Sequence, residues 1–210
     1  MPLKAVAPVF APNVNWTGWF GGVSLGYAAG DTESFVGAGG TNIKLKPSGF
    51  EVALHGGYDY QPLNSNFVFG FEVALPLLQL DDTKQDPVVV GESYSAKSRW
   101  AVMTTGKVGY AVANWLPYVG GGVGFINSRG SSVIPGVVTQ DDTHTHTGWL
   151  FVTGVRYLVN PNWWVGLQYM HGGYSRETYV TAPAFPNANR SVAFDTDVVM
   201  FQAAYRFGRW

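Results

Sequence analysis

Apolar and polar residues alternate one by one along much of this chain. Between Phe50 and Tyr60, the large apolar residues share one parity, whereas Glu51, His55 and Asp59 share the other. Successive side chains of a β-strand point to opposite faces, so this alternation predicts strands and not helices. The predicted strands are residues 18–28, 48–60, 66–76, 97–111, 117–127, 147–158, 162–171 and 197–207.

The connections between these strands differ in length in a regular way. Three are short, at residues 61–65, 112–116 and 159–161, and are rich in Asn and Pro. Four are long, at about residues 29–47, 77–96, 128–146 and 172–196, and are rich in Gly, Ser, Thr, Asp and Pro. Short turns at one end and long loops at the other, around an even number of strands, are typical of an up-and-down barrel.

The two faces of the predicted strands differ in size and charge. One face carries large aliphatic and aromatic residues and no charge, whereas the other carries Gly, Ala, polar and charged residues. The interior of an eight-stranded barrel has just enough room for side chains, so the large residues must lie outside. An uncharged aromatic exterior suits lipid and not water. The pattern therefore predicts an all-β fold, an eight-stranded antiparallel up-and-down transmembrane β-barrel. A soluble, lipocalin-like barrel would need the opposite face assignment.

Composition supports a membrane protein and excludes several other classes. Only 13% of residues are charged, against about 25% in ordinary soluble domains. The net charge of −1 argues against a general nucleic-acid binder, which needs a basic surface. The absence of Cys excludes disulfides, thiolate metal sites and cysteine catalysis.

Aromatic residues gather near both ends of the predicted strands. Amphipathic aromatic rings of this kind prefer the level of the lipid headgroups, so the pattern predicts two girdles that face lipid. The predicted girdle residues are Trp19, Tyr27, Tyr58, Trp100, Tyr110, Trp149, Tyr157, Trp163 and Tyr205.

Several short motifs, distributed over nearly the whole chain, carry a family resemblance. They include Asn15-Trp16-Thr17-Gly18-Trp19-Phe20, Phe69-Gly70-Phe71-Glu72, Gly106-Lys107-Val108-Gly109-Tyr110 and Trp115-Leu116-Pro117-Tyr118-Val119. With them the chain resembles the small outer-membrane β-barrels of alphaproteobacteria, the rhizobial and Brucella-type outer membrane immunogenic proteins, a porin-like family with barrels of the OmpA type. The resemblance implies a Gram-negative cell outer membrane, with both termini and the short turns in the periplasm and the four long loops outside the cell.

The resemblance also implies an organisation and a set of partners. Residues 1–15 would form a Pro-rich periplasmic segment, and residues 16–210 a single transmembrane barrel. No signal peptide precedes them, so we expect a mature chain. The expected partners are outer-membrane lipid and lipopolysaccharide, the barrel assembly machinery, and neighbouring barrels or surface-layer components. The expected assembly signal is Tyr205 and Phe207, together with the terminal Trp210, where the family usually ends in Phe.

Charged residues on the small-residue face are predicted to meet inside the barrel. We expect a structural network that fills the lumen, because an unpaired charge there would be costly. The alternative is a narrow gated pore that opens when the pairs break. The predicted network is Glu51, Asp59, Glu72, Arg99, Lys107, Arg156 and Arg206.

The segment from Asp142 to His146 is the best candidate for a metal site. Asp142, His144 and His146 share one parity and would point the same way from a strand, as paired metal-binding histidines do. The alternative is an ordinary polar loop. Some relatives in the resembled family are linked to haemin binding, which implies haemin as a second candidate ligand. Apart from these ligands, we expect no cofactor.

Three functions therefore compete. The first is a non-enzymatic structural or surface protein whose long loops contact neighbours or extracellular molecules. The second is a narrow pore, or a protein that binds haemin or metal. The third is a lipid A-modifying enzyme, because His171 and Ser175 resemble the His and Ser of outer-membrane lipid A deacylases. Their spacing differs from that family's pair and the sequence identifies no orienting carboxylate, so we expect no enzyme.

Overall fold

A computed structural model describes residues 14–36, 43–46, 48–77, 81–85, 93–134, 137–180 and 189–207. Side chains are described for a narrower set, namely 14–31, 46, 48–77, 100–127, 143–177, 193 and 195–207. The strands are β1 (Gly18–Val36), β2 (Ile43–Leu45), β3 (Ser48–Tyr60), β4 (Phe67–Pro76), β5 (Asp81–Gln85), β6 (Ser93–Tyr110), β7 (Trp115–Ile134), β8 (Val137–Asn160), β9 (Trp163–Val180) and β10 (Asn189–Phe207). No helix among these residues has the length and apolar character needed to span a membrane.

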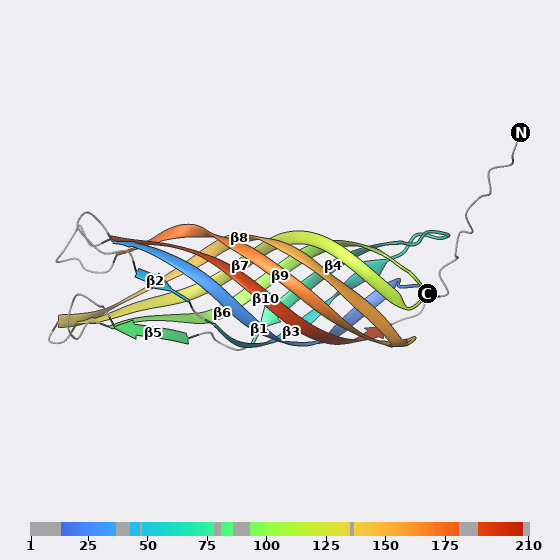
Figure 1. Ribbon diagram of the computed structural model, residues 1–210, viewed down its shortest axis with the longest axis horizontal. Coiled ribbons are helices and arrows are strands. Elements are labelled where there is room, and N and C mark those ends of the chain that lie inside the picture. The colour runs from blue at the N-terminus through green and yellow to red at the C-terminus, as the bar shows by residue number, and fades with distance from the viewer. Residues whose placement is uncertain are drawn as a thin grey trace, which may run out of the picture.

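The strands form one antiparallel sheet that closes on itself. The antiparallel ladders run β1–β3, β3–β4, β4–β6, β6–β7, β7–β8, β8–β9 and β9–β10, and β1 pairs with β10 from Trp19↔Phe207 to Val36↔Arg190. β2 and β3 pair with the same side of β1, and β4 and β5 pair with the same side of β6. The ten strands therefore occupy eight positions around the barrel, which we call columns. The predicted eight-stranded up-and-down barrel is confirmed, and Figure 1 shows its elongated shape.

The predicted orientation of the two faces is also confirmed. On β3, Phe50 and Leu54 are exposed on the outside, whereas Glu51, Ala53 and His55 are buried in the lumen. The girdle aromatics lie on the outer face, often as cross-strand pairs such as Trp19–Tyr58 and Trp163–Tyr205, with ring centroids 5.1 and 5.2 Å apart. Such pairs stabilise adjacent strands and present amphipathic rings to the headgroup region.

The strands are longer than the alternation predicted. β8 has 24 residues, whereas a tilted strand needs only about 9–11 to cross a bilayer. Much of the segments expected as loops at 29–47, 128–146 and 172–196 is therefore strand. We call this end of the barrel the hairpin end. The opposite end carries the short turns and both described chain ends, and we call it the short-turn end (Figure 1).

At the hairpin end the described strands separate into two groups. The pairing of β8 with β9 stops at Gly148↔Tyr174, and the ladder of β3 with β4 stops one hydrogen bond beyond Ala53↔Pro76. Beyond these points β2, β1, β10 and β9 remain one sheet, and β5, β6, β7 and β8 remain another. Figure 1 shows the two groups diverging at its left end.

Candidate functional site

Four charged side chains meet in the middle of the lumen. Arg156 Nη1 lies 3.0 Å from Asp59 Oδ2, and Arg156 Nη2 lies 2.6 Å from Glu72 Oε2. Lys107 Nζ lies 2.8 Å from the same Glu72 oxygen. All four residues are buried, and their two positive and two negative charges balance. Charge-assisted hydrogen bonds hold this arrangement, and they are stronger than bonds between neutral groups because donor and acceptor are both ionised.

Neutral groups complete the network. Lys107 Nζ and the Tyr118 hydroxyl both donate to Gln168 Oε1, each at 2.8 Å. The guanidinium of Arg156 also lies over the rings of Trp164, Phe20 and Tyr118, at 4.3, 4.8 and 5.1 Å from their centroids. These aromatic faces stabilise a desolvated cation. The network is therefore a packed, neutral plug.

The sequence provides the room that these large side chains need. A Cβ at Gly154 would lie 2.6 Å from the Tyr118 hydroxyl, and one at Gly70 would lie 2.5 Å from Asp59 Oδ1. Glycine on the lumen face therefore lets Tyr118 and Asp59 approach the barrel wall. This explains why small residues alternate with the apolar outer residues on these strands.

The predicted network is only partly assembled. Asp59, Glu72, Lys107 and Arg156 meet as described, whereas Glu51 is buried beside Gly26 of β1 and makes no hydrogen bond or ion pair within the described part of the chain. The side chain of Arg99 lies outside the described residues.

Arg206 has a different role from the one predicted. It donates to backbone carbonyls at the short-turn end, at 2.8 Å for Asn15, 3.2 Å for Thr17 and 3.3 Å for Pro161. These bonds hold the segment before β1 across the end of the barrel. The physical reason is position, because Arg206 is the last lumen-facing residue of β10 and the carbonyls of the turn and of this segment lie beside it.

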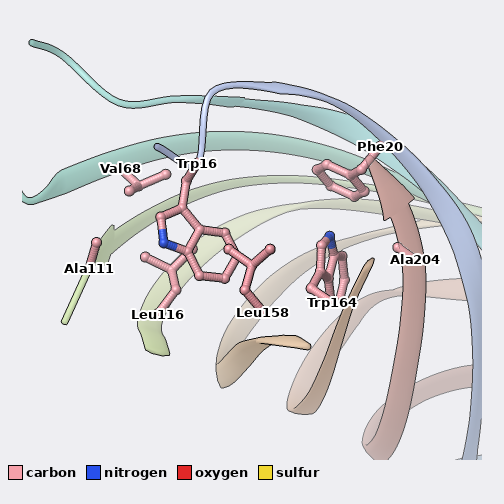
Figure 2. Packing of buried hydrophobic residues seen from close by; sticks show 8 residues of the cluster. All are labelled: Trp16, Phe20, Val68, Ala111, Leu116, Leu158, Trp164 and Ala204. Atoms are coloured by element: carbon pink, nitrogen blue, oxygen red, sulfur yellow. The ribbon is translucent and has the colours of Figure 1, made fainter. Parts of the chain in front are cut away.

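The segment held by Arg206 places Trp16 inside the barrel. Trp16 is fully buried, and its backbone N–H donates to Gln61 Oε1 at 2.8 Å. Figure 2 shows the apolar cluster that closes the short-turn end. Its members are Trp16, Phe20, Val68, Ala111, Leu116, Leu158, Trp164 and Ala204.

The predicted network left out two neutral side chains that contact it in the lumen. His55 lies beside the rings of Phe20 and Trp164, and its Nδ1 lies 3.9 Å from Glu72 Oε2. His55 and Gln168 carry the lumen parity of their strands, which was the available signal. Neutral groups, however, have no charge partner to indicate that they belong to a network.

The predicted metal ligands lie at the hairpin end. His146 is fully buried on the lumen side and donates from Nδ1 to the Ser175 carbonyl, 3.2 Å away. His144 is half-buried, and the side chain of Asp142 lies outside the described residues. Among the described side chains, no three His, Cys, Asp or Glu residues are placed to hold a metal ion. Metal or haemin binding stays a prediction. Titration with Zn²⁺ and haemin, beside the His144→Ala/His146→Ala double variant, tests it, and equal binding by both proteins would remove it.

The His171 side chain lies on the outer face and has an acidic partner that the sequence did not identify. His171 Nδ1 lies 2.8 Å from Asp197 Oδ1, which also accepts from the Tyr169 hydroxyl at 2.5 Å. Ser175 lies four residues further along β9, a rise of about 13 Å for a strand. His171 and Ser175 therefore do not form a nucleophile–base pair.

A closed antiparallel barrel with a charge-free outer belt between two aromatic girdles defines an integral outer-membrane β-barrel. The chain matches the sequence model of the outer membrane protein beta-barrel domain over residues 4–207 and belongs to this family. It is a protein of the Gram-negative cell outer membrane. No curated protein matches the chain.

Two solved structures, OprG and AlkL, have the same fold. The outer membrane protein OprG from Pseudomonas aeruginosa matches with a TM-score of 0.60 at 12% identity, covering 94% of this chain and 100% of its own. AlkL, solved in DMPC lipid bilayers, matches with a TM-score of 0.53 at 14% identity, covering 99% and 98%. The Ail protein of Yersinia pestis is 17% identical, covers 90% and 99%, and has a TM-score of 0.49.

Proposed function

We propose that the protein is a non-enzymatic surface scaffold, a sealed barrel that displays long hairpins outside the cell. The observation that carries this proposal is the filled lumen. The Trp16 cluster occupies the short-turn end, the Arg156 network the middle, and a second apolar cluster that includes Met103, Met170 and Met200 lies nearer the hairpin end. A barrel filled at three heights supports display more than transport.

The proposal includes an orientation and a closer family assignment. We assign the short-turn end, with the Pro-rich residues 1–15, to the periplasm and the hairpin end to the cell exterior. The motifs around Trp16, Glu72 and Lys107 support placement among the small alphaproteobacterial outer-membrane barrels.

The same proposal names the partners. Lipid and lipopolysaccharide would surround the girdles, and neighbouring barrels or surface-layer components would contact the hairpins. The barrel assembly machinery would read Tyr205 and Phe207 on β10, together with Trp210, which lies outside the described residues.

Single-cysteine labelling tests the orientation, because the natural chain has no Cys. Thr145→Cys on the exposed face of the β7–β8 hairpin should react with a membrane-impermeant maleimide on intact cells. Leu63→Cys, in a short turn where the residue is 91% exposed, should react only after lysis. The reverse pattern, or equal labelling of both variants on intact cells, would contradict the proposal.

A further inference from the structure

The outer face carries one polar cluster at the level of the hairpin-end girdle. Tyr169 and His171 on β9 and Asp197 on β10 point outward beside Trp149 of β8. The indole lies over Gly173, where a Cβ would come within 2.6 Å of Trp149 Nε1, and the centroids of the Trp149 and His171 rings are 5.3 Å apart. Three adjacent strands thus build an aromatic surface from two rings tilted by 57° to each other, with a carboxylate beside the imidazole.

Two polar groups in this cluster keep an open position among the described residues. Asp197 Oδ1 accepts from both Tyr169 and His171, whereas Oδ2 makes no bond among the described residues. His171 uses Nδ1 for the carboxylate, so its Nε2 stays available, as is usual when a carboxylate orients an imidazole. The side chains of His171 and Asp197 are 32% and 53% exposed. The cluster therefore offers a hydrogen-bond acceptor, an imidazole nitrogen and an aromatic face to a ligand beside the barrel.

Its neighbours fix the level of the cluster relative to the membrane. Leu167 and Val199, one step toward the membrane centre, are apolar and exposed on the outer face. Asp195 and Asp31, one step toward the hairpins, are exposed acidic residues paired across β10 and β1. The cluster lies where the outer face changes from lipid-facing to polar, at the headgroup level.

From this geometry we infer that Trp149, His171 and Asp197 form a binding site for the sugar headgroup of a glycolipid, which in the outer membrane is lipopolysaccharide. Sugar hydroxyl and amide groups donate strong hydrogen bonds to a carboxylate, and the apolar face of a sugar ring packs on an indole. A phosphate alone fits poorly, because Asp197 would repel it. The inference rests on the proposed function, which places the hairpin end on the outer leaflet.

Competitive lipid binding to the purified barrel tests the site. The barrel is exchanged from detergent into mixtures of phosphatidylcholine with deep-rough lipopolysaccharide, and the glycolipid molecules retained are counted by native mass spectrometry. We expect Asp197→Asn and Trp149→Leu each to weaken retention about tenfold, the effect of losing one charge-assisted hydrogen bond or one packed ring. Trp100→Leu, a girdle residue on β6, should leave retention unchanged.

Two further competitors show whether the site recognises the sugar or the phosphate of the glycolipid. Dephosphorylated lipid A should compete as well as the phosphorylated form, and phosphatidylglycerol should not compete. Equal retention by the Asp197→Asn variant and the natural protein would overturn the inference, as would loss of competition on dephosphorylation. All variants should keep their heat-modifiable, folded form in phosphatidylcholine. Because this assay uses purified protein, its failure is distinct from a failure of the surface-labelling experiment.

Discussion

Arg156 is the residue on which the lumen plug depends. It is buried at 1% exposure and bridges Asp59 of β3 and Glu72 of β4 from the opposite wall. Both carboxylates are buried. The guanidinium therefore compensates charges that the barrel could not otherwise bury.

Removing that guanidinium should be strongly destabilising. We expect Arg156→Met to lower the free energy of unfolding by about 3–5 kcal/mol, because it leaves a buried charge uncompensated. Urea unfolding in phospholipid vesicles, followed by tryptophan fluorescence, measures the change. Adding Asp59→Asn should restore at least half of the loss, since the pair of Lys107 and Glu72 then remains balanced. A loss below about 1 kcal/mol for the single variant would contradict this role.

Neighbouring positions on β3 test the two faces of the barrel wall. Leu54 is 46% exposed to lipid and Ala53 is 1% exposed in the lumen. We expect Leu54→Arg to cost about 2–4 kcal/mol, because it places a cation in the hydrocarbon, and Ala53→Ser to be nearly silent. Unboiled gels that resolve folded from unfolded barrel provide the measurement. Normal folding of Leu54→Arg beside a defective Ala53→Ser would invert the face assignment.

Parity and charge made part of the lumen predictable. Glu72, Lys107 and Arg156 fall on the small-residue parity of their strands, and opposite charges in a narrow barrel must meet. Parity alone gives no height within the barrel, which is why Glu51 and Arg206 were assigned to the same network. The roles of Gln168 and His55 depend on contacts across the lumen, and the sequence does not predict such contacts for a neutral side chain.

At the scale of elements, the segment before β1 acts as a cap. Trp16 lies in the apolar cluster inside the barrel. The Gln61 side chain links it to the first short turn, because Gln61 accepts from the Trp16 backbone N–H and donates to the Ser65 carbonyl, each at 2.8 Å. Arg206 holds the same segment from β10. The cap therefore contacts both the first and the last strand of the barrel.

Loss of the cap should weaken the barrel without changing its topology. We expect Trp16→Ala to cost about 3–5 kcal/mol, the usual range for truncating a buried aromatic residue, while the strand ladders remain closed. Leu63→Ala, at a fully exposed position of the adjacent turn, should stay within about 0.5 kcal/mol of the natural protein. Equal effects of the two substitutions in urea unfolding would show that the cap is not structural.

Strand cores were predictable from alternation, whereas strand lengths were not. Inside the bilayer, one face meets lipid and the other meets the lumen, so the pattern is sharp in segments such as Phe67 to Leu75. Above the girdle both faces are polar, and residues such as Thr143 to Thr147 look like a loop although they continue β8. The separation of β8 from β9 was not predictable either, because it coincides with a bulge on β9 opposite Val192 to Phe194, and the alternation does not indicate a bulge.

On the scale of the whole molecule, the barrel is a closed wall around a filled interior. The eight columns leave no open edge in the membrane-spanning part, which satisfies the backbone in lipid. The lumen plug and the two apolar clusters occupy successive heights. The two strand groups at the hairpin end extend from this fixed base (Figure 1).

The central claim, a sealed scaffold, is tested most directly by conductance of the purified full chain in planar lipid bilayers. The natural protein should insert and show no stable conductance steps, because paired charges and buried rings fill the lumen. Folded insertion is checked in parallel by heat modifiability of the reconstituted sample. Reproducible steps at the level of a general porin, from folded protein free of contaminating porins, would contradict the account and favour a pore.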